Sequence, residues 1–447
     1  MNHPNIKVPP PGPKAKELVE RDHNVISSSY GRWYPLVVER AEDCIIWDVD
    51  GNSYIDFNSG LVVMNVGHNH PRIVKAVKEQ VEKLIHYSNT DFYYREAIEL
   101  AEELTKITPG NFPKKVFFGN SGAEAVEAAI KAIKWHTRRP RIIGYIGAFH
   151  GRTMGALSIT ASKPIYRDHF FPMMPGVTHV PFPYCYRCPF KMEYPSCGLY
   201  CVDFIEEQVL NKYIPPDEVG AFFFEPIQGE GGYVVPPPKY FQKLKKLADK
   251  YDIKIVSDEV QAGMGRAGKW FAIEHWSVEP DVISSAKGIA SGFPLGAMIS
   301  RAELQEWDKG AHASTFGGNP VSARVALEVI RIIREEKLLD NATKVGEHIM
   351  KRLNEFKDDY AVVGDVRGKG LMIGMELVKN KETKEPAKEI AHDVMIDSWK
   401  NGVAVITAGI STIRIAPPLT ITSELADKAL DIIENSIKKV MKEREVK

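Results

Sequence analysis

The 447-residue sequence lacks an excess of charge of either sign, because 58 Lys and Arg residues balance 58 Asp and Glu residues. A chain with zero net charge gives no electrostatic reason to expect nucleic acid as its main partner. The sequence also lacks an apolar run of membrane-spanning length, and residues 1–22 lack the apolar core of a signal peptide. We therefore expect a cytoplasmic protein that does not enter a membrane.

Cysteine is scarce, with five residues in the chain, and Cys44 stands alone. The others are concentrated in "CYRCPFKMEYPSCGLYC" at Cys185, Cys188, Cys197 and Cys201. Their C-x2-C and C-x3-C spacing departs from the paired C-x2-C pattern of a zinc ribbon, which favours reduced thiols or a disulfide over a metal. Disulfides are unusual in a cytosol except in some hyperthermophiles, so thiols, a disulfide and a structural zinc or iron–sulfur site all stay open.

The order of patterns along the chain predicts an α/β architecture. A Pro-rich start predicts an extended arm over 1–22, and "CIIWDVDGNSYIDF" predicts a β-hairpin that turns at Asp50-Gly51. From Lys114 onward, short apolar runs alternate with helical segments, which indicates a mainly parallel sheet covered by helices on both faces. After residue 320, helices and short strands predict a smaller α+β domain. We predict an arm and hairpin over 1–60 that pack with the small domain, a large domain over 61–320 and the small domain over 321–447.

Reactive residues follow the predicted strands of the large domain. "KVFFG" leads into "NSGAEAVEAAIKAIKWH", where a Ser-Gly pair opens a helix and could bind an anion. Taken alone, this stretch favours a plain helix cap over an anion site. Asp258 ends the apolar run "DIKIVSD", and Lys287 follows "PDVISSA". Ligands bind beyond the carboxyl ends of parallel strands. A lysine, an acid and a phosphate cradle at one edge are the parts that pyridoxal phosphate requires.

Two other motifs do not indicate sites. "GMGRAG" at 263–268 fits the dinucleotide pattern G-x-G-x-x-G, but polar residues separate it from the strand and "KWFAIEHW" is a poor crossover helix. "GHNHP" places His68 and His70 two apart without a further ligand cluster, so it predicts a turn before the helix that starts near Pro71.

The motifs in sequence order resemble those of the class III aminotransferases, pyridoxal-phosphate enzymes of fold type I. The resemblance covers nearly the whole chain through "GHNHP", "GNSGAEAVEAAIK", "FHGRT", "EPIQGEGG", "SDEVQAGMGR", "AKGIASGFPLGA", "STFGGNP", "GDVRGKGLMIGMEL" and "IRIAPPLTI". It implies that Lys287 forms a Schiff base with the cofactor and then shuttles protons, while Asp258 keeps the pyridine nitrogen protonated. The further cofactor contacts that it implies are Ser121, Gly122, Ala123, Phe149, His150, Val260, Gln261 and Thr315. Since Thr315 would reach the phosphate of the neighbouring subunit, the active unit is expected to be a homodimer or a dimer of dimers.

The resemblance also implies a substrate site formed by Leu61, Arg152, Glu230 and Arg414. Arg152 would meet the carboxylate distal to the reacting amine, and Arg414 would take the α-carboxylate of an oxo acid, a task that suits the guanidinium fork. Each arginine could instead form a purely structural salt bridge. Glu230 would pair with Arg414 when no α-carboxylate is present, so that the pair acts as a gate.

These roles predict ping-pong transfer of an amino group from an ω-amino acid, such as 4-aminobutyrate or ornithine, to 2-oxoglutarate. The alternative on the same scaffold is an amino-acid racemase. In racemases that resemble this family an aspartate lies where "QGEGG" has Glu230, so glutamate favours transfer. A rival from another class is a zinc-structured or metal-sensing protein built on the cysteine segment.

Overall fold

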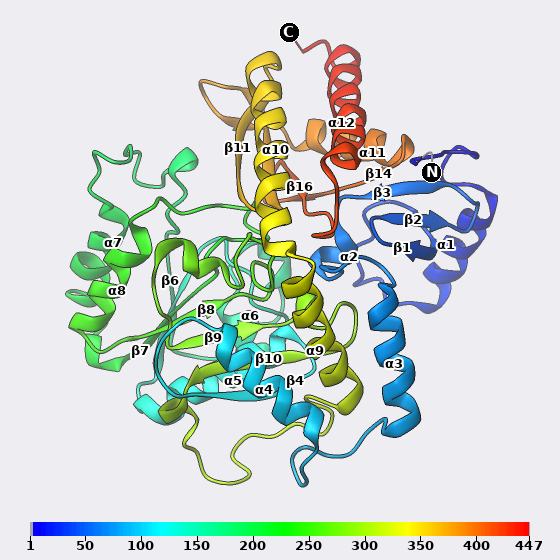
Figure 1. Cartoon of the computed structure of the whole chain (residues 1–447). Coiled ribbons are helices and arrows are strands. Elements are labelled where there is room, and N and C mark those ends of the chain that lie inside the picture. The colour runs from blue at the N-terminus through cyan, green and yellow to red at the C-terminus, as the bar shows by residue number, and fades with distance from the viewer. Residues whose placement is uncertain (1–2, 447) are drawn as a thin grey trace.

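A seven-stranded sheet lies at the centre of the computed structural model, which describes residues 3–446 (Figure 1). Its strands follow the order β4-β10-β9-β8-β7-β5-β6. The strands are β4 (Lys114–Gly119), β5 (Arg141–Tyr145), β6 (Val177–Val180), β7 (Val219–Phe224), β8 (Lys254–Asp258), β9 (Val282–Ser285) and β10 (Gly296–Arg301). All pairs from β9 to β6 are parallel, whereas β10 runs antiparallel to both β4 and β9. The mainly parallel sheet is therefore confirmed, and β6 and β10 are strands that the apolar pattern did not predict.

Alternate residues of the strands supply two separate cores. Ala221 and Phe223 of β7 belong to the cluster that contains the buried face of helix α5 (Gly122–Thr137). Phe222 and Phe224 belong to the opposite cluster, together with Phe241 of helix α8 (Tyr240–Lys250). Because successive side chains of a strand point to opposite faces, a continuous apolar run such as "FFF" requires cover on both sides.

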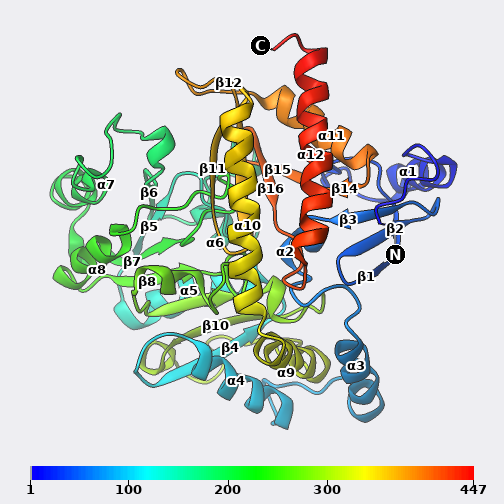
Figure 2. The same ribbon diagram turned by 45° about the horizontal axis from the view of Figure 1, so that its top comes forward.

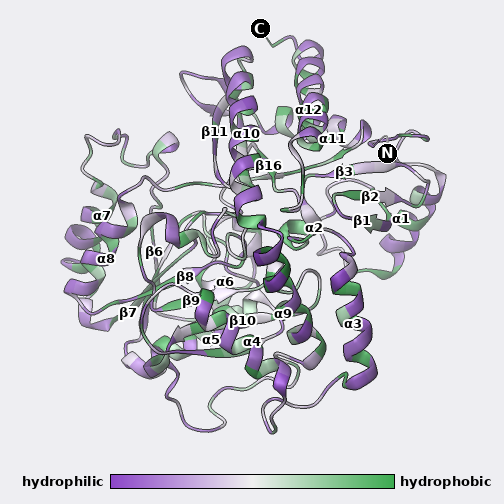
Figure 3. Cartoon of the chain, in the orientation of Figure 1, coloured by the Kyte–Doolittle hydropathy of each residue, from purple (hydrophilic) through white to green (hydrophobic). Residues whose placement is uncertain are grey.

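The remaining helices cover the sheets of the molecule or connect their strands. They are α1 (Pro13–Val25), α2 (Ser59–Val62), α3 (Pro71–Lys83), α4 (Arg95–Ile107), α6 (Met154–Ile159), α7 (Tyr200–Phe204), α9 (Pro320–Glu335), α10 (Leu338–Asp359), α11 (Lys388–Lys400) and α12 (Ser423–Glu443). Helices such as α3, α10 and α12 show alternating hydrophilic and hydrophobic bands, as expected for amphipathic helices with one buried face (Figure 3). No helix among residues 3–446 is long and apolar enough to cross a membrane.

Two smaller sheets lie on the side of the molecule that carries both ends of the chain (Figure 2). The first has the order β1-β2-β3-β14 and the second β11-β12-β16-β15, with β13 paired to β12. Their strands are β1 (Val38–Glu42), β2 (Ile45–Asp48), β3 (Ser53–Asp56), β11 (Val363–Lys369), β12 (Met372–Asn380), β13 (Glu385–Pro386), β14 (Val403–Ala404), β15 (Ile406–Ala408) and β16 (Thr412–Ile415). The hairpin at Asp50-Gly51 is confirmed by the antiparallel β2–β3 pair. Since β3 pairs with β14, the N-terminal strands share a sheet with the C-terminal region. The domain limits at 60 and 320 stay a prediction.

The prediction of an extended arm over 1–22 was wrong from Pro13 onward, where α1 begins. Proline is well tolerated in the first turn of a helix, since the N–H that it lacks has no helical partner there. Asp50 of the hairpin turn accepts hydrogen bonds from the N–H groups of Lys14 and Ala15 at 3.0 Å each. A contact from a distant turn therefore caps the helix, and local sequence could not reveal it.

Candidate active site

A cavity of about 390 Å³ opens at the carboxyl ends of the parallel strands. Every predicted cofactor contact except Thr315 lines it, namely Ser121, Gly122, Ala123, Phe149, His150, Asp258, Val260, Gln261 and Lys287. Strand β10 runs in the opposite direction, so the segment that precedes it, from Gly292 to Leu295, reaches the same edge and closes another wall. The topology of the sheet thus gathers residues from distant parts of the chain into one site.

Asp258 and His150 form a buried pair at one wall of the cavity. His150 Nδ1 lies 2.7 Å from Asp258 Oδ2, and both residues are only 3% exposed. Asp258 Oδ1 accepts a hydrogen bond of 3.0 Å from the Val260 N–H, which fixes the carboxylate at the end of β8. The other ring nitrogen, His150 Nε2, is buried without a hydrogen-bond partner in the described chain. This carboxylate is positioned to hold a proton on a heteroaromatic ligand nitrogen.

The N-terminus of α5 lines the cavity where the sequence predicts a phosphate cradle. Ser121 is the N-cap residue, and its Oγ accepts a hydrogen bond of 3.2 Å from the Glu124 N–H. The first N–H groups of a helix have no helical acceptor and, with the helix dipole, attract a phosphate. A Cβ on Gly122 would lie 2.8 Å from Val260 Cγ1, so only glycine allows this close approach. The structure therefore supports the phosphate cradle and also the plain cap, which Ser121 provides at the same time.

Lys287 follows β9 in a left-handed conformation, with φ of 49°, at the start of a short 3-10 helix, Lys287–Ile289. Burial lowers the pKa of the Lys287 amine below its ordinary value, and the charge of Arg414 lowers it further. Asp258, Glu230 and Glu225 oppose this shift without reversing it. A depressed pKa increases the share of neutral amine, which is the form that attacks a carbonyl carbon or accepts a proton.

Arg414 and Glu230 form the predicted ion pair. Arg414 on β16 is 1% exposed, and its Nη2 lies 3.2 Å from Glu230 Oε1 while its Nη1 donates to Gln261 Oε1 at 3.2 Å. Lys163 Nζ and the Tyr166 hydroxyl each lie 3.4 Å from Glu230 Oε2. Burial alone would raise the pKa of Glu230, but Arg414, Lys163 and Lys287 outweigh it and hold this pKa below its usual range.

Five predicted residues do not line the cavity. Two of them are Glu230 and Arg414, which form the ion pair described above, and the other three are Arg152, Leu61 and Thr315. Arg152 is exposed, and its guanidinium lies 4.9 Å from the ring centre of Tyr166 and 5.8 Å from that of Phe149. Leu61 is 43% exposed within α2, where the φ values from Ser59 to Val62 are all positive and form a left-handed turn. Thr315 is exposed beside Phe316, which is itself 60% exposed. The roles of these residues stay predictions.

The sequence interpretation missed Glu225, a buried carboxyl that lines the cavity. Its oxygens accept hydrogen bonds from the N–H groups of Phe149 at 2.9 Å and Gly229 at 3.0 Å. Burial raises the pKa of Glu225 to about 7. The signal was present, because Glu225 follows an apolar strand just as Asp258 ends one. Lys163 and Tyr166 were also missed, and nothing in the sequence separates them from ordinary surface residues.

The cysteine segment lies outside this cavity. Cys185, Cys188, Cys197 and Cys201 line a separate space of about 20 Å³ and carry free thiols. Among residues 3–446, no three His, Cys, Asp or Glu side chains are placed to hold a metal ion. Arg187 within this segment and Tyr184 just before it both donate a hydrogen bond to the carboxylate of Glu376 on β12. These contacts connect the cysteine segment to the sheet that contains β11, β12, β16 and β15.

Comparison with known proteins identifies the family to which this arrangement belongs. The family model "Aminotransferase class-III" matches residues 26–437. The chain belongs to the class III aminotransferase family. A relative named alanine/serine racemase from Pyrococcus horikoshii is 46% identical, with 98% of this chain and 93% of the relative covered. A relative named probable 4-aminobutyrate aminotransferase from Bacillus subtilis is 37% identical, with coverage of 89% and 92%.

Solved structures of aminotransferases share the fold of this class III enzyme. The PLP-bound crystal structure of an amine transaminase from an uncultivated Pseudomonas species matches with a TM-score of 0.86 and 30% identity, covering 93% of this chain and 98% of that one. The cofactor of this family is pyridoxal 5′-phosphate. The cavity fits this cofactor, because the N-terminus of α5, the carboxylate of Asp258 and the amine of Lys287 line one space, where they would hold a phosphate, a ring nitrogen and an aldehyde respectively. Phe149 and Val260 add apolar side chains to the cavity lining, against which a ring would pack.

Proposed function

We propose that this class III enzyme transfers the amino group of an ω-amino acid, of the 4-aminobutyrate or ornithine type, to 2-oxoglutarate. The observation that carries the proposal is the closed Arg414–Glu230 pair. An ω-amine substrate has no carboxylate beside its reacting carbon, so it leaves the pair closed. An α-oxo acid brings a carboxylate that can replace Glu230 on Arg414.

In the proposed transamination, Lys287 and Asp258 have different roles. Pyridoxal phosphate, when bound, supplies the carbonyl group that accepts the amine and the ring that withdraws electrons. Lys287, with its depressed pKa, takes the proton from the amine-bearing carbon of the substrate and later returns it. Asp258, held by His150 and the Val260 N–H, keeps a proton on the pyridine nitrogen and so maintains the electron-withdrawing form of the ring.

The cations near Glu230 support a dicarboxylate or amino-acid substrate. Lys163 and Arg414 contact Glu230 directly, and Tyr166 contacts both Arg152 and Glu230. In the proposed ω-amine complex, Arg152 binds the distal carboxylate. In the oxo-acid complex, Arg414 binds the α-carboxylate while Glu230 remains with Lys163 and Tyr166.

A second candidate function is racemisation of an amino acid, favoured by the relative that is named alanine/serine racemase and is 46% identical over almost the whole chain. Racemisation requires an acid or a base on the face opposite Lys287. Glu230 is the carboxyl that the gate could offer, but its lowered pKa keeps it ionised and makes it a poor acid while Arg414 remains bound. We favour transfer because the closed Arg414–Glu230 pair suits a substrate that has no carboxylate beside its reacting carbon.

One experiment separates the two functions. Single enantiomers of several amino acids, together with 4-aminobutyrate and ornithine, are incubated with the holoenzyme with and without 2-oxoglutarate. Transfer predicts glutamate from an ω-amine only when the oxo acid is present. Inversion of an enantiomer without any oxo acid, and no glutamate from ω-amines, would refute the proposed function and establish racemisation.

We also infer that the working unit is a homodimer. Thr315 is exposed beside the exposed Phe316, and a second copy of the chain would bury both while bringing Thr315 to the phosphate of its neighbour. Sedimentation of the holoenzyme measures the state, and a monomer with full activity would contradict the inference.

A further inference from the structure

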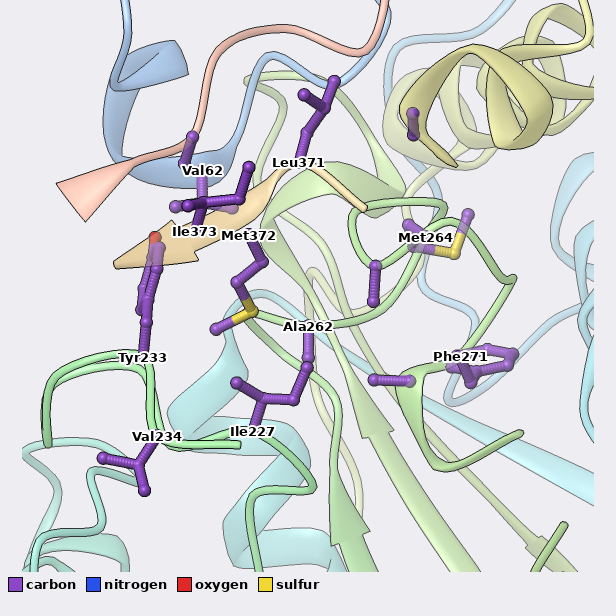
Figure 4. Packing of buried hydrophobic residues seen from close by; sticks show 14 of the residues in the cluster. Val62, Ile227, Tyr233, Val234, Ala262, Met264, Phe271, Leu371, Met372 and Ile373 are labelled. Atoms are coloured by element: carbon purple, nitrogen blue, oxygen red, sulfur yellow. The ribbon is translucent and has the colours of Figure 1, made fainter. Parts of the chain in front are cut away.

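The loop that carries Glu230 packs against the small sheet formed by β11, β12, β16 and β15. This gate loop, residues 228–234, is closed by an isolated bridge between Gln228 and Val234. Its residues Tyr233 and Val234 pack in the apolar cluster that also contains Met372 and Ile373 of β12 (Figure 4). The position of Glu230 therefore depends on contacts that lie outside the cavity.

Arg367 on β11 makes the polar contacts to the backbone of the gate loop. Its Nη2 donates to the Gly232 carbonyl at 2.5 Å, and its Nε donates to the Tyr233 carbonyl at 3.2 Å. A Cβ on Gly232 would lie 3.2 Å from Arg367 Nη2, so the glycine allows this approach. On the other side of the loop, the Gly409 N–H donates to the Glu230 carbonyl at 2.8 Å.

The register of the small sheet places Arg367 and Arg414 on either side of one glycine. Gly374 of β12 is paired with Arg367 of β11 and with Arg414 of β16. A Cβ on Gly374 would lie 3.1 Å from Tyr233 Cβ and 3.2 Å from the Gly232 carbonyl oxygen. One row of the sheet thus presents two guanidinium groups to the same loop. Arg414 binds the Glu230 side chain and Arg367 binds the backbone that follows it.

The next row on the same face of the sheet anchors Arg367. Glu376 is paired with Asp365 and with Thr412 in the register. Arg367 Nη1 lies 2.8 Å from Asp365 Oδ2 and 2.7 Å from Glu376 Oε2, and Nη2 donates to Thr412 Oγ1 at 3.3 Å. Burial alone would raise the pKa of Glu376, but Arg367, Tyr184 and Arg187 outweigh it and keep the carboxyl ionised.

We propose that Arg367, anchored by Asp365 and Glu376, is a positioning residue that holds the gate loop so that Glu230 can close on Arg414. Tyr184 and Arg187 extend this anchor into the cysteine segment, which gives that segment a structural connection to the gate. The inference rests on the proposed function, since it concerns the gate that distinguishes ω-amines from α-amino acids.

The test compares an ω-amine donor with glutamate in single-turnover half-reactions of the holoenzyme, followed by cofactor absorbance. Lysine at position 367 keeps the charge but cannot donate to two carbonyls and two carboxylates at once. In Arg367→Lys, the ratio of kcat/KM for 4-aminobutyrate or ornithine to that for glutamate is expected to fall about tenfold. Amide hydrogen exchange in 228–234 of the cofactor-free protein is expected to accelerate as well. The matched control is Arg352→Lys, which alters an ion-paired arginine of α10 that binds Asp427 and Asp431.

The double variant Glu230→Gln/Arg367→Lys shows whether Arg367 acts through the gate. We call the ratio of kcat/KM for the ω-amine to that for glutamate the donor ratio. If Arg367 acts through Glu230, Arg367→Lys leaves the donor ratio of the Glu230→Gln variant unchanged, whereas a general structural effect would lower this ratio again. An unchanged ratio and unchanged exchange in Arg367→Lys would overturn the inference. If that variant does not fold, Tyr184→Phe removes one anchor of Glu376, and an unchanged ratio there overturns it equally. A donor ratio that does not respond to Glu230→Gln itself, or no reaction with any ω-amine, would instead refute the proposed function.

Discussion

Replacing Arg414 by lysine tests the gate most selectively. The guanidinium is 1% exposed and donates to two acceptors, Glu230 Oε1 and Gln261 Oε1, each at 3.2 Å. A lysine ammonium can keep the charge but cannot present two parallel N–H groups to an α-carboxylate. We therefore expect Arg414→Lys to weaken the oxo-acid half-reaction while it leaves the ω-amine half-reaction nearly intact.

The magnitude follows from one lost charge-assisted hydrogen bond. Such a bond contributes about 1.5–3 kcal/mol, which corresponds to a loss of roughly 13- to 160-fold in kcat/KM for 2-oxoglutarate. For the ω-amine we expect a change of less than about threefold, since the gate stays closed in that step. The loss in the oxo-acid step should be mainly an increase in KM, because the carboxylate contact is present before the reaction begins.

The assay follows each half-reaction separately, by the absorbance of the cofactor in a single turnover. Arg352→Lys again serves as the control for a general effect of replacing an ion-paired arginine. An equal loss in both half-reactions would refute the reasoning, because Arg414 would then support the whole site rather than the second carboxylate.

Three further predictions concern stability and cofactor binding. Burial raises the pKa of Glu259 from 4.5 to about 8, so the folded chain retains a proton that the unfolded chain releases, and stability falls as pH rises between these values. Glu259→Gln should flatten that slope in denaturant titrations at pH 5 and pH 8, and an unchanged slope would show that another group is responsible. Gly122→Ala places a Cβ 2.8 Å from Val260 Cγ1, so the affinity for pyridoxal phosphate should fall at least about tenfold in equilibrium dialysis, while Ala123→Gly should weaken it less. Asp50→Ala removes the side chain that caps α1 and should lower the stability of this helix by about 1 kcal/mol. Amide hydrogen exchange in residues 13–25 should become faster, while activity should not change.

Residues that end a strand were the part of the site that sequence could predict. Asp258 and Lys287 stand out because a charged group after an apolar run is costly to bury without a purpose. The same reasoning applies to Glu225, which closes β7 in the same way but was not selected. The resemblance to a family supplied Glu230 and Arg414, and the structure brings them together across a long stretch of the chain.

Contacts between distant segments were the part that sequence could not predict. Strand β10 has an ordinary apolar pattern, and only its antiparallel insertion between β4 and β9 explains why the residues before it line the cavity. Helix α1 depends on Asp50 from a separate hairpin, and the gate loop depends on Arg367 through the register of β11, β12 and β16. These positions are set by packing and pairing, which leave no local pattern in the sequence.

The central claim is that Lys287 carries pyridoxal phosphate in this class III enzyme. Borohydride reduction of the yellow holoenzyme, followed by peptide mass mapping, tests it directly. We expect the cofactor to become fixed to the peptide that contains Lys287, and Lys287→Ala to yield no such adduct. A cofactor fixed on another lysine of the native enzyme, or an undiminished adduct in Lys287→Ala, would show that Lys287 is not the lysine that binds it.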